Sequence, residues 1–589
     1  MADVNKKSSV FDSPVFKSRI KSANVKIFPE GALGYFLGPT LALVSNSVLA
    51  NQYNNYLTDV MKVPAWFLWF LPVISVVFVV AGNILVGKLM DKLNTRAGKA
   101  RPLILISIPI SVLALLLLLV FPPLGNDVAS LVFIAIGYNM WFAIAYPFYY
   151  TSHSATVNLS TRNSKDRSLL ATISNATQLA AVGLVSMVLP MVSFLFFPTE
   201  NNVVIADKSY GAWKIVAIVL IVFSALGALV EFLFKRERIT EEIVNTGVKV
   251  EKKVIPMKDQ AKVCFKDKFW IMIIIFFFLY QLGGMLKNVS QIYFCRAALT
   301  NLTLDMIEGQ RFSAFIAMIG AVPTALGMVI SWPLSNKIGK GKAIAFGAIV
   351  STIGGLIGFI DPSSFPLVVT AFVVKALGST PAMYLSLALL ADIIDHHEAK
   401  HGIRTDGLSM TIYGAIMAGM TGVATGILNA VLGAFNFTEM ATVGGAGGTE
   451  AFKWAMTFLF LGGETVCYAI IAVMFMFMKV EKFSKFDHIA IVADQKALAE
   501  KEGRVYVDPH LKMMLDEAEY VLKAKCEAEN LNFDQEWAGK QAEVTEKYQA
   551  EKAKKEEKEA KRSNPAKDAE TLKEFNEIRV KNGRPPISM

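Results

Sequence analysis

The apolar residues of this chain fall into long runs instead of the alternating pattern of strands or the narrow stripes of surface helices. Twelve runs approach or exceed the roughly 20 residues that a helix needs to cross a bilayer. They cover 34–57, 66–90, 102–121, 129–152, 169–197, 212–234, 270–294, 313–335, 343–360, 365–392, 408–435 and 453–479. Because lipid offers no partner to free backbone N–H and C=O groups, such runs form helices packed as bundles. We therefore predict an all-α integral membrane fold with twelve transmembrane helices.

Positive charges mark alternate loops between these runs. The loops after the second, fourth, eighth and tenth runs contain several Lys and Arg residues, whereas the loops at 122–128, 361–364 and 436–452 contain none. Short cytoplasmic loops carry the excess of Lys and Arg, so both termini are expected to face the cytoplasm, with the protein in the plasma membrane. The first 30 residues are basic but have no apolar core, so no cleavable signal peptide is expected.

A long charged loop at 235–268 divides the runs into six and six. The stretches GKLMDKLNTRAGKARP (87–102) and LSNKIGKGKAIAFG (334–347) follow the second and eighth runs, a weak internal repeat that is typical of transporters with paired halves. The predicted domains are a cytoplasmic N-terminal segment (1–32), an N-terminal six-helix bundle (33–234), a cytoplasmic central loop (235–268), a C-terminal six-helix bundle (269–480) and a charged tail (481–589).

The composition changes sharply in the tail. AEVTEKYQAEKAKKEEKEAKR (542–562) is rich in Ala, Glu and Lys, with opposite charges at helical spacing, which favours an exposed helix. We expect a helical cytoplasmic extension. The sequence leaves open whether it binds a cytoplasmic partner or the anionic membrane surface.

The overall composition excludes several classes of protein. Of 589 residues, 53% are hydrophobic and 18% are charged, against about 25% charged in soluble proteins. The net charge of +10 is spread over loops between apolar runs, so no nucleic-acid partner is expected. The four cysteines lack metal or disulfide spacing, and no run carries a nucleophile beside a base. We expect no enzyme activity, no metal and no cofactor.

Three stretches together resemble a known family. They are YNNYLTDV (53–60), GKLMDKLNTRAGKARP (87–102) and ADIIDHHEAKHGIRTDGL (391–408), and in this order and spacing they resemble the glycoside-pentoside-hexuronide:cation symporters, the melibiose-carrier branch of the major facilitator superfamily. The resemblance covers about 30–480. It implies two six-helix bundles around a central cavity, alternating access, and uptake of a sugar or glycoside with a cation.

The loops that carry the resemblance also supply candidate gate residues. The third stretch matches the family pattern of charged residues most specifically, and Arg96 and Arg101 are expected to reach carboxylates of the other half. Such pairs would close the cytoplasmic gate, although the same charges also suit a role in topology alone. The predicted gate residues are Asp91, Arg96, Arg101, Asp392, Asp395, Glu398 and Arg404.

The resemblance does not extend to the family's binding residues. Where the melibiose-carrier pattern places carboxylates, a lysine and a tryptophan that hold the cation and the sugar, this chain has Leu43, Val79, Asn83, Ala145, Ala418 and Tyr149. The sodium and galactoside sites are therefore not carried over. The coupling ion, H⁺ or Na⁺, stays open, with Asn83 and Glu464 as candidate coupling residues, and uncoupled diffusion is a further alternative.

Ionisable residues deep in a span usually face a polar cavity, and Lys287, Lys375 and Glu464 lie in such positions. Two lysines without a cavity carboxylate would favour an anionic substrate such as a hexuronide. In the alternative, a lysine pairs with Glu464 or reaches a backbone carbonyl. Aromatic residues repeat along the fourth run and suit a sugar ring, although helix packing explains them too. The predicted substrate-binding residues are Asn46, Tyr138, Trp141, Tyr149, Lys287, Gln291 and Lys375.

Two other functions fit a scaffold without the family's coupling residues. The chain could be a membrane sensor or regulator that signals through its tail, or a lipid carrier of the same superfamily branch. A secondary transporter of a sugar is the main prediction.

Overall fold

The computed structural model describes residues 11–588 except 12, 23–24, 94, 162–163, 201–202, 242–255, 444–447, 502, 504, 530 and 563–564. Residues 242–255 of the predicted central loop and residues 1–10 therefore lie outside the described residues. The described part is mostly helical, and its strands are one short antiparallel pair, β1 (Thr199–Glu200) and β2 (Val203–Val204). The mostly helical fold is as predicted.

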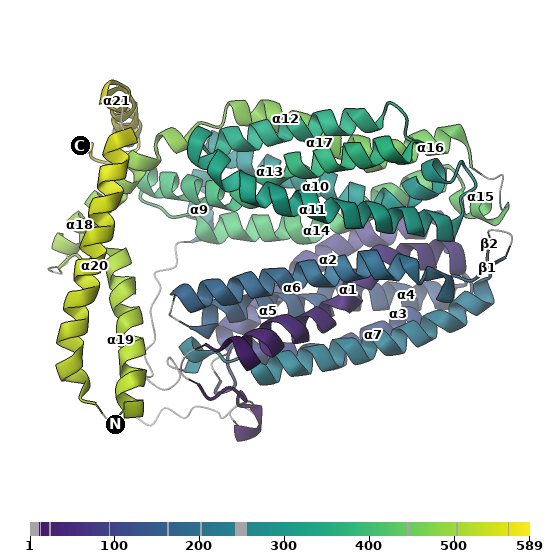
Figure 1. The fold of residues 1–589 in the computed structure, drawn as a ribbon, viewed down its shortest axis with the longest axis horizontal. Helices are drawn as coiled ribbons and strands as arrows, with labels where there is room; N and C mark the ends of the chain where they lie inside the picture. The colour runs from purple at the N-terminus through teal and green to yellow at the C-terminus, as the bar shows by residue number, and fades with distance from the viewer. Residues whose placement is uncertain are drawn as a thin grey trace.

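The first half of the chain forms one bundle of long helices (Figure 1). Its helices are α1 (Gly38–Asn55, flanked by Ile27–Leu37 and Tyr56–Val60), α2 (Ala65–Lys92), α3 (Arg101–Leu119), α4 (Val128–Asn139, continued by Met140–Ala145), α5 (Tyr146–Ser160), α6 (Ser164–Met191) and α7 (Ala206–Phe234). Its core gathers buried aromatic and aliphatic residues, such as Tyr56, Trp213 and Leu118.

The second half forms a second bundle beside the first. It contains α9 (Met257–Cys264), α10 (Lys268–Phe294, continued by Cys295–Leu299), α11 (Met306–Ile338), α12 (Lys340–Gly358), α13 (Phe365–His401), α14 (Asp406–Ala434), α15 (Phe437–Val443), α16 (Glu450–Thr457, continued by Phe458–Gly462) and α17 (Gly463–Met476). Eleven helices among the described residues are long and apolar enough to cross a membrane. Helix α6, with its apolar part Ala180–Met191, occupies the place of the remaining predicted run.

The two halves meet along α2 and α14, and along α6 and α11. Glycines make the first contact close: a Cβ atom on Gly422 would lie 2.5 Å from the Pro72 carbonyl oxygen, and one on Gly433 would lie 2.6 Å from the Ala65 Cβ. Small residues let membrane helices approach this closely. Many large apolar side chains on α2, α7 and α11 are exposed, Val329 and Trp332 among them, as a lipid-facing surface requires.

The tail forms a layer of helices at one end of both bundles (Figure 1). We call this the tail end, and the opposite end, which carries β1, β2 and α15, the far end. The tail helices are α18 (Ser484–Lys501), α19 (Pro509–Glu529), α20 (Phe533–Arg562) and α21 (Pro565–Lys581). Phe575 is fully buried beside Phe483 and Phe486, and Arg579 donates to Asp494 and to the Ala399 carbonyl at the end of α13. The tail is thus anchored to the second half.

Candidate functional site

A buried ion pair joins the two halves at the far end. The Arg296 guanidinium, after α10, donates from both terminal nitrogens to the Asp59 carboxylate, after α1, at 3.0 and 2.9 Å. The two side chains are 2% and 3% exposed. Arg296 also donates to the Leu304 carbonyl and lies over the Phe437 ring. A bidentate arginine–carboxylate pair is strong and directional, so it holds the ends of α1 and α10 in a fixed geometry.

Uncharged polar side chains extend this contact toward the centre. The amides of Gln52 and Gln310 donate to each other at 3.0 and 2.7 Å. Asn54 donates to the Tyr293 hydroxyl at 2.7 Å and accepts from Asn429 at 2.9 Å. We call these residues, with Asp59 and Arg296, the far-end network. The network therefore joins the two halves through one ion pair and several hydrogen bonds.

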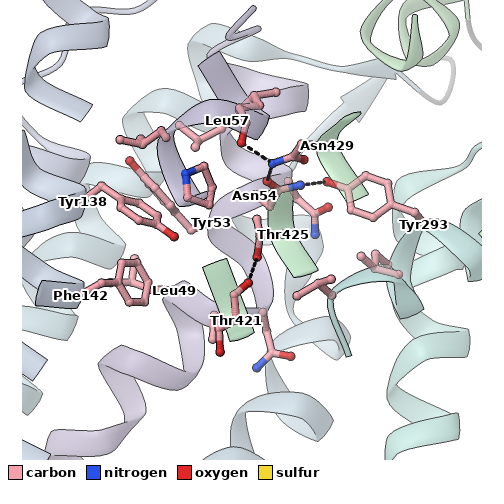
Figure 2. A pocket seen from close by; sticks show the side chains of 18 of the residues that line it. Leu49, Tyr53, Asn54, Leu57, Tyr138, Phe142, Tyr293, Thr421, Thr425 and Asn429 are labelled. Carbon is pink, nitrogen blue, oxygen red and sulfur yellow. Dashed lines mark hydrogen bonds between the residues drawn. The ribbon is translucent and has the colours of Figure 1, made fainter. Parts of the chain in front are cut away.

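A cavity of about 50 Å³ lies between the halves beside this network. Figure 2 shows Tyr53, Tyr138 and Phe142 on one side of it, and Thr421 and Asn429 on the other. Since one water needs about 10–15 Å³ on this measure, the cavity holds a few waters and excludes a sugar ring. The halves are therefore closed on each other at this level.

The predicted aromatic residues on the fourth run separate into two groups. Tyr138 lines the cavity between the halves. Trp141 and Tyr149 instead line a cavity of about 10 Å³ inside the first half. Trp141 donates to Asn46 at 3.3 Å, and the Tyr149 hydroxyl donates to Glu231 on α7. The stripe therefore does not present one continuous face to the space between the halves.

The three ionisable residues predicted deep in the spans meet inside the second half. Lys375 Nζ lies 2.9 Å from the Glu464 carboxylate and donates to the Leu461 carbonyl at 3.0 Å, and Lys287 Nζ lies 3.5 Å from the same carboxylate. The expectation of two lysines without a carboxylate is wrong, because Glu464 lies between them. The alternative of a lysine paired with Glu464 or bound to a carbonyl matches the geometry.

One positive charge nevertheless remains in excess at this cluster of Lys287, Glu464 and Lys375. Lys375 is buried, but the Lys287 side chain is 23% exposed. Gln291, one turn further along α10, donates to Ser313 on α11. The Leu461 carbonyl belongs to a stretch of wide π-helical turns, Phe458–Gly462. Such turns release carbonyls from the helix ladder and often mark functional sites.

Several of the predicted gate residues contact partners within their own half. Arg101 is buried and donates to the Ala97 and Phe232 carbonyls of its own half, so its expected inter-half pair is absent. Asp392 accepts from Lys340, and Arg404 donates to Asp395 and Glu398, all within the second half. The side chain of Asp91 lies outside the described part, and Arg96 makes contacts of its own.

Asn83 is engaged within the first half. Its amide donates to the Val79 carbonyl at 2.9 Å, and its oxygen accepts from Thr151 at 3.2 Å. The Asn83 side-chain oxygen is therefore already engaged by Thr151. The apolar side chain of Val79, one turn earlier on α2, supplies no second ligand for a cation.

Sequence reasoning missed the far-end network and a second buried cluster around Glu231. Asp59 lies within the YNNYLTDV stretch that carries the resemblance, so a signal was present. Arg296 is one of few basic residues at the far end, which was a second signal. Glu231 is followed four residues later by Lys235, the i,i+4 spacing of a helical ion pair, although the predicted span ends at 234 and the predicted loop begins at 235.

Two bundles of long apolar helices that meet through a polar interface match the architecture of secondary transporters of the major facilitator type. A family model for "MFS/sugar transport protein" matches residues 34–482. The chain therefore belongs to this family, whose members are transporters and not enzymes, and the resemblance to the glycoside-pentoside-hexuronide symporters is confirmed.

Individual relatives support the same family at low sequence identity. The chain is 24% identical to the isoprimeverose transporter of Lactiplantibacillus pentosus over 67% of this chain and 78% of that protein. It is 22% identical to the glucuronide carrier protein homolog of Escherichia coli (strain K12), over 65% and 78%. Among solved structures, the nucleoside transporter NupG superposes with a TM-score of 0.52 at 14% identity, over 77% of this chain and 99% of NupG. The last similarity concerns the fold alone.

Proposed function

We propose that this protein imports a sugar or glycoside across the plasma membrane by alternating access, with transport coupled to H⁺ or Na⁺. In this proposal α6 is the fifth of twelve spans, and both termini and the tail lie in the cytoplasm. The far end then faces the outside. The alternation of basic and uncharged loops supports this orientation.

The observation that carries the proposal is the far-end network. Asp59 with Arg296, and Gln52 with Gln310, join the halves at the far end, while at the tail end Asp392 binds Lys340 of its own half. An interface closed at one end is what alternating access requires of an inward-facing conformation. Polar pairs at such an interface can exchange for water when the halves separate, so they suit a contact that forms and breaks.

The substrate class follows from two lines of support. Relatives named as an isoprimeverose transporter and a glucuronide carrier homolog support a sugar or glycoside. The excess positive charge of Lys287 and Lys375 over Glu464 supports an anionic one, with the partly exposed Lys287 as the group that meets it. Asn46, Tyr138, Trp141, Tyr149 and Gln291 remain proposed substrate residues, which requires rearrangement around the small cavities of this conformation.

The tail helices expose both acidic and basic side chains, which supports binding to a cytoplasmic protein partner. We expect that the protein does not bind nucleic acid. A sensor or a lipid carrier on this scaffold remains an alternative that the experiment must separate.

Purified protein in liposomes tests the proposal. Vesicles loaded with unlabelled glycoside should exchange it for labelled glycoside outside, from a panel of neutral and acidic sugars, and an imposed proton or sodium gradient should drive accumulation. Binding without exchange would indicate a sensor instead. Exchange of labelled lipid without exchange of any sugar would indicate the lipid carrier.

A further inference from the structure

A second buried polar cluster lies inside the first half, near the tail end. It consists of Tyr149 and His153 on α5, Ser174 on α6, Glu231 on α7, and Lys235 just after α7. Glu231 and Lys235 are fully buried, and His153 is 3% exposed. Burying charged groups is costly unless they are paired and hydrogen-bonded.

Continuous hydrogen bonds connect the members of this cluster. Glu231 accepts from the Tyr149 hydroxyl, and its other oxygen lies 2.8 Å from His153 Nδ1 and 2.6 Å from Lys235 Nζ. His153 Nε2 lies 2.8 Å from the Ser174 hydroxyl. The chain therefore runs from Tyr149 through Glu231 and His153 to Ser174.

His153 has two partners of opposite kind at one nitrogen. Nδ1 lies 2.8 Å from Glu231, which only accepts, and 3.2 Å from Lys235, which only donates when charged. A neutral imidazole satisfies one of them at a time. A doubly protonated imidazole donates to Glu231 and to Ser174, while Lys235 keeps its contacts to Glu231 and to Thr156 at 2.8 Å. The geometry thus accommodates an extra proton with little loss of hydrogen bonding.

The charged groups around His153 are themselves paired. The negative charge of Glu231 and the positive charge of Lys235 cancel. Nearby, Glu30 is paired with Arg238, and Glu237 accepts from the backbone N–H groups of Lys99, Ala100 and Arg101. On the other side, the Tyr35 ring faces Lys235 at 4.2 Å. The Tyr149 and Tyr150 rings stack against the His153 ring, and Tyr146 stacks against Tyr150. The cluster is neutral with a neutral imidazole and carries one positive charge when the imidazole is protonated.

The cluster also reaches the proposed substrate residues. Tyr149 lines the cavity of about 10 Å³ together with Trp141 and the hydroxyl-bearing Ser107, Ser111 and Ser224. A cavity of this size suits a single water. Trp141 in turn donates to Asn46. A sugar that displaces Trp141 or Asn46 would therefore alter the surroundings of the Tyr149 hydroxyl, and through it the charge of Glu231.

We propose that the His153–Glu231 pair is the site that carries the coupling proton of this transporter, with Tyr149 and Ser174 as its connections to the substrate cavity and to the tail end. The inference rests on the proposed function and selects H⁺ over Na⁺. Loading adds one proton to the pair, so that His153 donates through both ring nitrogens. Unloading removes that proton toward Ser174, and Glu231 and Lys235 again cancel.

The test separates coupling from exchange in proteoliposomes. For Glu231→Gln and His153→Gln, we expect accumulation driven by an inward proton gradient to fall at least about tenfold. Counterflow of the same labelled glycoside at equal pH should stay within about threefold of the original protein. Glu30→Gln is the matched control: it is an equally buried carboxylate at the same end, paired with Arg238, and it should keep proton-driven accumulation.

The outcomes are distinct. Accumulation that persists in both variants, or that in the original protein follows a sodium gradient and not a proton gradient, would overturn the proton site. Absence of counterflow in the original protein would overturn the proposed function instead.

The site is then tested without any sugar, by infrared difference spectra of the purified protein between acidic and alkaline buffer. Those spectra should show protonation bands that Glu231→Gln and His153→Gln both alter, and bands unchanged in both variants would overturn it. Unfolding temperatures in detergent identify a variant that has not folded.

Discussion

Asp59→Asn tests the far-end network most sharply, because it removes one charge from a buried inter-half pair and preserves side-chain shape. Arg296 would keep its bond to the Leu304 carbonyl and its position over the Phe437 ring, but it would lose its counter-charge. Removing one partner of a buried pair costs about 3–5 kcal/mol. We take the lower value, about 3 kcal/mol, since those two contacts remain.

The cost falls mainly on the conformation in which the pair is buried. When the halves separate at the far end, Arg296 meets water and its partner matters little. The equilibrium should therefore shift toward the far-end-open conformation by a factor of about 10², since 1.4 kcal/mol corresponds to tenfold.

A single cysteine at Leu57 reports this shift. Leu57 is 5% exposed and lines the inter-half cavity, and the four native cysteines are all buried. In vesicles with the far end outward, a membrane-impermeant maleimide should label Leu57→Cys slowly, and at least about tenfold faster after Asp59→Asn. Asp305→Asn, the same change at an exposed helix cap of the far end, should leave the rate unchanged.

An unchanged labelling rate in folded Asp59→Asn protein would show that the Asp59–Arg296 pair does not hold the far end closed. The charge exchange Asp59→Arg with Arg296→Asp should restore slow labelling, which separates the pairing itself from the loss of a particular side chain.

Three further predictions address other parts of the molecule. Lys287→Gln should raise the KM for an acidic glycoside about tenfold and leave that for a neutral one unchanged, as measured by uptake; equal effects on both would refute a charge contact. Arg579→Ala should release the tail from α13, so that limited proteolysis cuts it about tenfold faster, whereas unchanged cutting would mean that other contacts hold it. Burial raises the pKa of Asp487 above its ordinary value even though it is hydrogen-bonded to His396. Docking of the tail should therefore be strongest below the ordinary carboxyl pKa and weaken as pH rises through the raised value; Asp487→Asn should flatten that pH dependence of proteolysis, and a persisting dependence would assign it elsewhere.

The sequence predicted the bundle well because bilayer thickness and backbone hydrogen bonding leave few alternatives to long apolar helices. Run lengths and loop charges were sufficient for most spans. Helix α6 is the exception: its first part, SKDRSLLATISNATQ, is polar, so hydropathy is weakest there.

The site was predicted less well because it depends on which helices meet. Lys287, Lys375 and Glu464 come from three helices that are distant in sequence, and only the packing of α10, α13 and α17 shows that they share one cluster. The far-end network depends in addition on the conformation, which hydropathy does not encode. The predicted pairs between Arg101 and carboxylates of the other half would form only with the tail-end gate closed. The Arg101 side chain is instead buried against the Phe232 carbonyl, which opposes a role in that gate.

If sugar crosses between the two halves, the halves must separate at the far end during each transport cycle. Cysteines at Gln52 and Gln310, whose amides contact each other across the halves, can be joined by a short thiol cross-linker that a reducing agent cleaves. In proteoliposomes, counterflow of a glycoside should stop when the pair is joined and return on reduction, while each single cysteine variant treated alike keeps its activity. Undiminished counterflow through the joined protein would contradict the account.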